Sequence, residues 1–345
     1  MKYLLLPVLL LWGMGVGAQP TRPADYGLKA FSINDNKLGR INFYVDTMGL
    51  FKKAPLFIDI NGSGGLPLCI YINGKGFGAV SNTFDPNITA KTKEKYHYII
   101  LDKPGTPFCD TITTLQSAKE YDLHKLIAGY KVSDEYTRRL SLQWRVEATR
   151  KVISYLVKNH FWDHTKIVAY GYSEGGQVVP ALAVEDKRIT HVVTIAGSGL
   201  NQFYDNIAGW RIKAAKGEIT SRQAQDSINA SFKNIADIYK NPTATNKAFD
   251  GHSYKRWASF CAVAPFEQLR KLTIPIYMVA ATDDTSSPVY GLDYVLLDFI
   301  RLGKTNLTYE PCVGCNHYLT SIDNGKQVSH DYLQKILAWV DMHRQ

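Results

Sequence analysis

The sequence predicts an α/β fold, in which a mostly parallel central sheet is flanked by helices. Short apolar runs typical of buried strands alternate along the 345 residues with longer segments of helical periodicity. Several runs end in loops rich in glycine, serine, aspartate or histidine, which is typical of sheets with functional residues at their carboxyl ends. The length fits one large domain with an insertion, or at most two domains.

The first 18 residues are predicted to be a signal peptide. Lys2 provides a positive start, residues 3–12 are apolar, and the small residues 16–18 precede Gln19, the expected mature N-terminus. The apolar run is short for a bilayer, so no stable membrane span is predicted, although an uncleaved anchor is the alternative. We therefore expect a secreted or periplasmic protein.

The elements after this leader follow the predicted alternation. Residues 39–46 alternate like a strand near the edge of the sheet, and residues 56–60 form an apolar run that leads into the glycine-rich residues 61–65. Residues 96–101 read as another buried strand. The apolar spacing of residues 142–160 then predicts a helix.

The next segment contains the five residues Gly171-Tyr172-Ser173-Glu174-Gly175. Residues 166–170 before it indicate a buried strand, and residues 177–184 after it indicate a helix despite Pro180. A sharp strand-to-helix turn exposes its serine at the end of a sheet and points the helix N-terminus at the hydroxyl. The flanking glycines fit the crowding at such a turn. This pattern makes Ser173 a candidate nucleophile.

Between the strand predicted at residues 191–196 and the next strand lies an insertion. Apolar residues at helical spacing predict that residues 199–262 form a helical cap over the site, between core segments 29–198 and 263–345. A peripheral helical decoration is the alternative. The aromatic residues of this segment are expected mostly in its core: Phe203, Tyr204, Trp210 and Trp257.

Two later loops supply chemically suitable partners for Ser173. The strand predicted at residues 274–281 ends in a loop that contains Asp283 and Asp284, and the strand at residues 307–310 leads to His317. All three loops follow strands, so they meet at one edge of a parallel sheet. A histidine there can accept the proton of the serine, and a carboxylate can orient the imidazole.

On these motifs the chain resembles proteins of the α/β-hydrolase fold over roughly residues 29 to 345. The Ser-Glu-Gly-Gly form of the turn is similar to that of bacterial esterase-like and peptidase-like members. An aspartate four residues before Pro288 and the Gly314-x-x-His317 spacing also match the family. The resemblance favours Asp284 over Asp283 as the triad acid.

The same resemblance implies an oxyanion hole made of backbone N–H groups. One donor is the N–H of Glu174, and the other belongs to Gly62 or Ser63 in the loop of residues 61–65. The family usually has His-Gly where this chain has Asn61-Gly62. A plain glycine-rich turn is the alternative, whereas a phosphate-binding loop would need a different motif.

Composition and the cysteine positions bear on possible partners, cofactors and disulfides. The net charge of +9 is spread along the chain without a nucleic-acid-binding motif, so no nucleic-acid partner is predicted. Of five cysteines, Cys69 and Cys109 are candidates for a bridge, and Cys312 and Cys315 are either a structural disulfide or buried thiols. No cofactor is predicted. Metal binding by His160 and His164 is disfavoured because they fall at the opposite end of the strand from Ser173.

The leading hypothesis is an exported serine hydrolase that cleaves carboxylic esters by acyl transfer. In it Ser173 is the nucleophile, His317 the general base and acid, and Asp284 the residue that orients His317. A peptidase acting on short peptides is one alternative, and a non-catalytic binding protein with the same fold is the other.

Overall fold

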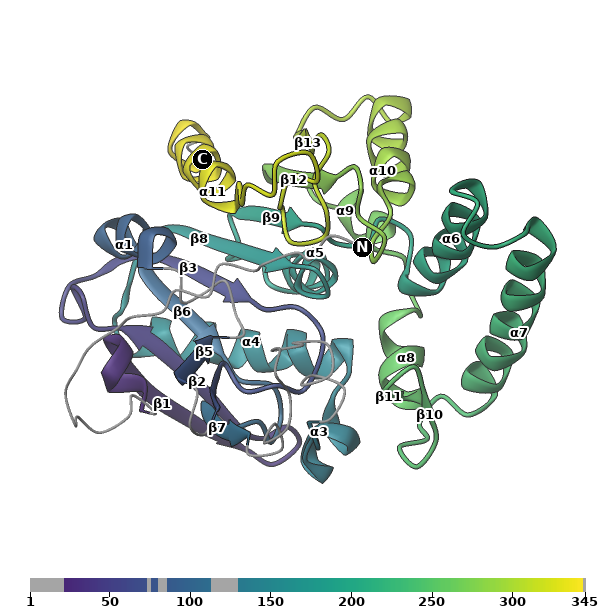
Figure 1. The fold of residues 1–345 in the computed structure, drawn as a ribbon. Coiled ribbons are helices and arrows are strands. Elements are labelled where there is room, and N and C mark those ends of the chain that lie inside the picture. The colour runs from purple at the N-terminus through teal and green to yellow at the C-terminus, as the bar shows by residue number, and fades with distance from the viewer. Residues whose placement is uncertain (1–21, 73–75, 80–85, 113–129, 344–345) are drawn as a thin grey trace.

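The computed structural model describes residues 22–72, 76–79, 86–112 and 130–343 (Figure 1). The predicted signal peptide, residues 1–18, lies outside the described residues. In the part of the chain that is described, no helix is both long and apolar enough to cross a membrane.

The centre of the structure is a mixed sheet with the strand order β1-β2-β6-β3-β8-β9-β12-β13. Strand β2 pairs antiparallel with both of its neighbours, whereas the strands from β6 to β13 pair in parallel, which confirms the predicted fold class. The strands are β1 (Leu28–Asp35), β2 (Gly39–Asp46), β3 (Ala54–Ile60), β6 (His97–Leu101), β8 (Trp162–Tyr172), β9 (His191–Ile195), β12 (Ile276–Ala281) and β13 (Leu307–Cys312).

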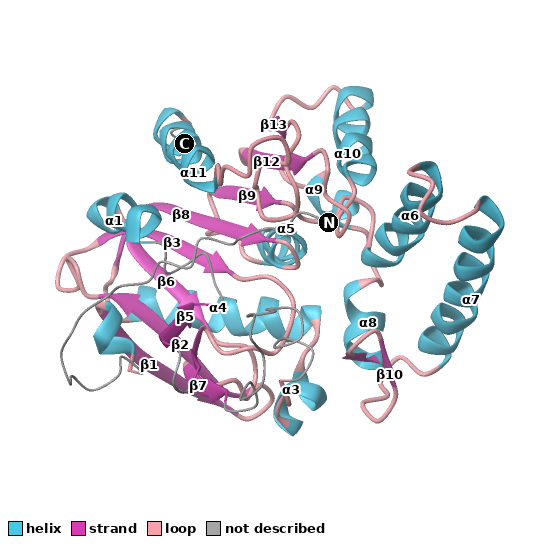
Figure 2. Ribbon diagram, in the orientation of Figure 1, coloured by secondary structure: helices cyan, strands magenta, loops and turns pink. Residues whose placement is uncertain are grey.

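Helices cover both faces of this sheet (Figure 2). Successive strand residues point to opposite faces, so the neighbours Ile58 and Phe57 belong to two different apolar clusters, one on each face. One face carries α4 (Leu142–Lys158), α5 (Gly175–Glu185) and α10 (Val289–Arg301), and the other carries α1 (Pro86–Lys95) and α11 (Ser329–Met342). Shorter elements are η1 (Pro23–Tyr26), α3 (Asp134–Arg139), α9 (Pro265–Leu269), and a small sheet of β4 (Cys69–Ile72), β5 (Gly76–Ala79) and β7 (Cys109–Ile112).

The segment between β9 and α9 is helical. It contains α6 (Gln202–Ala215), α7 (Ser221–Lys240), a short hairpin of β10 (Ala248–Phe249) and β11 (His252–Ser253), and α8 (Tyr254–Phe260). Figure 1 shows it beyond the carboxyl ends of β3 and β8. This insertion has an apolar cluster of its own that includes Phe203 and Trp257. Tyr204, expected in that core, is instead 38% exposed.

Hydrogen bonds attach the insertion to α4 and α5. Gln202 Nε2 donates to Gln177 Oε1 of α5 at 2.6 Å, and the N–H of Leu142 in α4 donates to Ser259 Oγ at 2.7 Å. The insertion therefore contacts the two helices that flank the serine turn. That it acts as a cap over a substrate stays a prediction.

The cysteines partly follow expectation. Cys312 and Cys315 form a disulfide. Cys69 and Cys109 face each other as paired residues of the parallel strands β4 and β7, but no disulfide joins these two described residues.

Candidate active site

Ser173 lies on a strained turn between the end of β8 and the start of α5. Its φ of 54° falls in the left-handed region that non-glycine residues rarely adopt. The N–H of Ser173 donates to the carbonyl oxygen of Ile195 at 2.8 Å, which holds the turn on β9. A Cβ on Gly175 would lie 1.9 Å from the carbonyl oxygen of Ile60, and one on Gly171 would lie 2.2 Å from that of Gly175. The turn therefore requires both glycines, as the sequence predicts.

The structure brings Ser173, His317 and Asp284 together. His317 Nε2 lies 3.0 Å from Ser173 Oγ, and His317 Nδ1 lies 2.7 Å from Asp284 Oδ2. In the tautomer with the proton on Nδ1, that N–H group donates a hydrogen bond to the carboxylate, and Nε2 is free to accept the proton of the serine hydroxyl. Asp284 is 3% exposed, so its carboxylate meets His317 away from bulk water. A nucleophile, a base and an orienting acid require such an arrangement, and these roles for the three residues stay predictions.

Hydrogen bonds join the loop that contains Asp284 to the loop that contains His317. The N–H of Gly314 donates to Thr282 Oγ1 at 2.8 Å, and the N–H of Asp283 donates to the carbonyl oxygen of Cys315 at 2.9 Å. The hydroxyl of Tyr172, at the end of β8, donates to the carbonyl oxygen of His317. Together with the disulfide, these bonds fix the position of His317 relative to Ser173 and Asp284.

The predicted oxyanion donors surround the serine turn. A Cβ on Gly62 would lie 3.2 Å from Ser173 Cβ, so the loop of residues 61–65 passes directly against the candidate nucleophile. Within the described part of the chain, the backbone N–H groups of Gly62, Ser63 and Glu174 have no hydrogen-bond acceptor. They are therefore available to a negatively charged oxygen formed at Ser173, and their role in catalysis stays a prediction.

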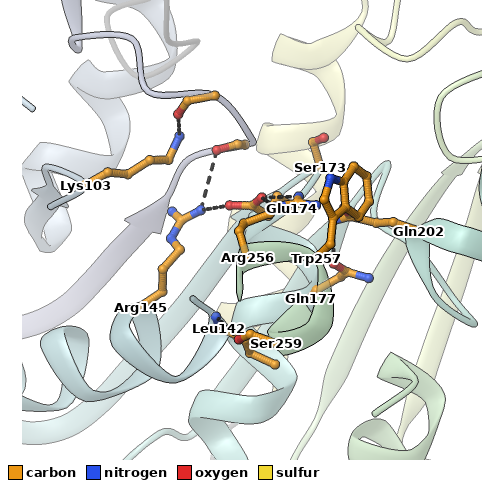
Figure 3. Close-up of polar contacts among 12 residues, drawn as sticks. Lys103, Leu142, Arg145, Ser173, Glu174, Gln177, Gln202, Arg256, Trp257 and Ser259 are labelled. Atoms are coloured by element: carbon orange, nitrogen blue, oxygen red, sulfur yellow. Dashed lines mark hydrogen bonds and ion pairs between the residues drawn. The ribbon is translucent and has the colours of Figure 1, made fainter. Parts of the chain in front are cut away.

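A buried ionic cluster lies beside this turn (Figure 3). Glu174, 2% exposed, accepts from Arg145 Nη1 at 2.8 Å and from Arg256 Nε at 3.2 Å. Burial alone would raise the pKa of Glu174, but the positive charges of Arg256, Arg145 and Lys103 lower it to about 2. Burial, reinforced by repulsion from Arg145, lowers the pKa of Lys103 to about 7. The sequence interpretation considered only the backbone of Glu174 and missed these three cations.

A second buried carboxyl group, that of Asp205 in α6, was also missed. Asp205 is 4% exposed. Burial raises its pKa to about 8, and the negative charge of Asp284 contributes to the increase. Burial therefore favours the protonated form of the Asp205 carboxyl group.

The two histidines considered for a metal site lie away from Ser173. Among the described residues, no group of three His, Cys, Asp or Glu side chains is arranged to hold a metal ion. His164 is near the amino-terminal end of β8 and His160 precedes the strand, both at the end opposite Ser173.

No protein-family model and no curated protein sequence matches the chain, but solved structures do. The α/β hydrolase GrgF from Penicillium sp. sh18 has a TM-score of 0.54 and 11% identity, over 92% of this chain and 99% of that chain. Est1E from Butyrivibrio proteoclasticus with bound ferulic acid has a TM-score of 0.50 and 15% identity, over 87% and 95%. Pyrococcus horikoshii acylaminoacyl peptidase has a TM-score of 0.56 and 10% identity, over 92% of this chain but 41% of that one. The chain therefore has the α/β-hydrolase fold.

Proposed function

We propose that the chain is an exported serine hydrolase that cleaves carboxylic esters through an acyl-enzyme intermediate. The observation that carries this proposal is the hydrogen-bonded series from Ser173 through His317 to Asp284. The fold by itself is compatible with many functions, so the proposal depends on the chemistry of these three residues.

The reaction begins when Ser173 Oγ attacks the ester carbonyl. His317 Nε2 accepts the hydroxyl proton, and the carbonyl oxygen becomes an oxyanion stabilised by the N–H of Glu174 and that of Gly62 or Ser63. His317 then donates the proton to the departing alcohol, which leaves an acyl group on Ser173. A water molecule, deprotonated by His317, attacks this acyl group, the bond from the acyl carbon to Ser173 Oγ breaks, and His317 returns the proton to Ser173 Oγ as the carboxylic acid leaves.

The first test is labelling with a fluorophosphonate, read by intact mass. Wild type should gain one adduct, and Ser173→Ala should gain none while remaining folded by circular dichroism. Loss of activated-ester hydrolysis in the same variant would complete the assignment. A folded wild type that takes up no phosphonate and hydrolyses no ester would contradict the proposal and favour the non-catalytic binding protein.

Ester preference is a separate question, because the similar structures include both Est1E with ferulic acid and an acylaminoacyl peptidase. We propose comparing p-nitrophenyl esters with p-nitroanilides of the same acyl groups. The expected result is a far higher kcat/KM for the esters than their greater intrinsic reactivity explains. Comparable values for anilides of short peptides would instead indicate a peptidase.

Export is part of the proposal and is supported by the pattern of residues 1–18. Expression of the full chain in a bacterial host, followed by N-terminal sequencing of the periplasmic and medium fractions, should give Gln19 as the first residue. An intact leader on protein confined to the cytoplasm would contradict export without affecting the catalytic assignment.

A further inference from the structure

The buried side chains of Arg145 and Lys103 bind the carbonyl oxygens of the loop that runs past Ser173. Arg145 Nη2 donates to Asn61 O and to Asn61 Oδ1, each at 2.8 Å, and Arg145 Nη1 reaches Gly62 O at 3.5 Å. Lys103 Nζ donates to Gly64 O at 2.5 Å. Figure 3 shows Lys103 and Arg145 converging on this loop from two separate parts of the chain. These contacts leave little freedom to its peptide groups.

The orientation of a carbonyl group also fixes the N–H group of the same peptide unit. A trans peptide is planar, so its C=O and N–H bonds point in opposite directions. Since Asn61 O and Gly62 O are bound to Arg145, the N–H groups of Gly62 and Ser63 are directed away from the guanidinium. Gly62 lies against Ser173, and within the described residues neither N–H has a protein acceptor. Arg145 therefore determines where these two donors point, and Lys103 holds the next part of the loop through Gly64 O.

Arg145 is also bound to the residue that follows the nucleophile. Its Nη1 donates to Glu174 Oε1 at 2.8 Å, and both side chains are at most 5% exposed. Arg256 of α8 holds the other carboxylate oxygen of Glu174. One guanidinium thus connects both predicted parts of the oxyanion hole. Only a planar fork with several N–H donors reaches all these acceptors at once, which a lysine cannot do.

From this geometry we infer that Arg145, supported by Lys103, is a positioning residue that holds the oxyanion hole in its active geometry through the carbonyl oxygens of residues 61–64. The inference rests on the proposed function, because it assumes that an oxyanion forms at Ser173. Both side chains are buried, at 5% exposed for Arg145 and 6% for Lys103, so they act through the loop. Their contribution should appear in the transition state and be nearly absent from ground-state binding.

The test variant is Arg145→Lys, which keeps a positive charge beside Glu174 but loses the fork. For an activated ester we expect kcat to fall by about 10- to 100-fold, with KM nearly unchanged. A displacement of catalytic groups by about 1 Å has an effect of this size on the rate. An alkylboronic acid, which becomes a tetrahedral anion on Ser173, should lose affinity in proportion, whereas the carboxylic acid product should bind as to wild type. If Arg145 had a purely structural role, the substitution would change the affinities for the boronic acid and for the carboxylic acid alike.

Arg188→Lys is the matched control. Arg188 binds the buried Asp186 through Nε at 2.8 Å and Nη2 at 2.5 Å, at the end of α5 remote from Ser173. This variant loses a comparable fork and should keep the wild-type kcat. Should Arg145→Lys fail to fold, Lys103→Met tests the same loop from Gly64, with a kcat loss and unchanged KM as the expected result.

The outcomes separate the two proposals. Wild type without ester hydrolysis or phosphonate labelling would overturn the proposed function and this inference with it. The inference alone would be overturned by a different result, in which wild type is active and Arg145→Lys folds but has the same kcat and boronate affinity as Arg188→Lys. If Arg145→Lys does not fold, the same comparison is made with Lys103→Met.

Discussion

His317 Nδ1 lies 2.7 Å from Asp284 Oδ2, although Asp283 is the first of the two adjacent aspartates that follow β12. The other oxygen of Asp284 accepts the N–H groups of Ser286 at 2.7 Å and Ser287 at 2.9 Å. The side chain of Asp283 instead accepts from Thr282 Oγ1 at 3.3 Å. Backbone donors thus fix one aspartate toward His317, and the loop turns its neighbour elsewhere.

Replacing each aspartate separately tests this difference. In Asp284→Asn the amide no longer stabilises the imidazolium or the required tautomer, so kcat should fall by about 10⁴-fold. Asp283→Asn is the matched control and should stay close to wild type. Steady-state hydrolysis of one activated ester measures both variants. A severe loss in Asp283→Asn with near-normal Asp284→Asn would show that the acid is misassigned.

The close approach at Gly175 gives a prediction about stability. A Cβ there would lie 1.9 Å from Ile60 O, so Gly175→Ala should lower the free energy of unfolding by about 3 kcal/mol, the upper range for overpacking. Gly209, within α6, is the control because a Cβ there meets nothing nearer than Thr285 O at 3.8 Å. Gly209→Ala should be neutral or stabilise by about 0.5–1 kcal/mol. Urea unfolding measures both, and equal effects would contradict the steric argument.

Sequence patterns predict what is encoded locally. Ser173, Asp284 and His317 each follow a short apolar strand, and parallel strands bring such loops to one edge. The buried cluster around Glu174 has no local signal, because Lys103, Arg145 and Arg256 come from distant segments and each reads as an ordinary surface charge. One indication was available in the sequence. Glu174 directly follows Ser173 at the turn, and a carboxylate buried there needs a positively charged partner because an unpaired buried charge is unfavourable. Strand β1 was missed because it lies at the edge of the sheet, where only Leu28 is buried and four of its eight residues are exposed.

Because the pKa of Glu174 is lowered, the free energy of unfolding should depend on pH in the acid range. Its folded value of about 2 lies below the ordinary 4.5, so the ion pairs stabilise the fold fully above pH 4.5. That contribution is lost as the pH falls from 4.5 to 2. Glu174→Gln should therefore be less stable than wild type at neutral pH, and the difference should shrink across this window. Glu185→Gln, which changes an exposed ion pair, serves as the control. A constant difference between wild type and Glu174→Gln would count against the assignment.

Asp205 should make the free energy of unfolding change with pH in the opposite direction. Its folded pKa of about 8 lies above the ordinary 3.8, so between these values the folded chain keeps a proton that the unfolded chain has lost. The free energy of unfolding therefore falls as the pH rises through this window. Asn cannot titrate, so Asp205→Asn should gain stability relative to wild type from pH 5 to pH 8. Asp226→Asn, at an exposed site on the neighbouring helix α7, is the matched control. Urea unfolding at several pH values measures all three proteins, and parallel profiles for wild type and Asp205→Asn would mean that Asp205 is ionised in the fold.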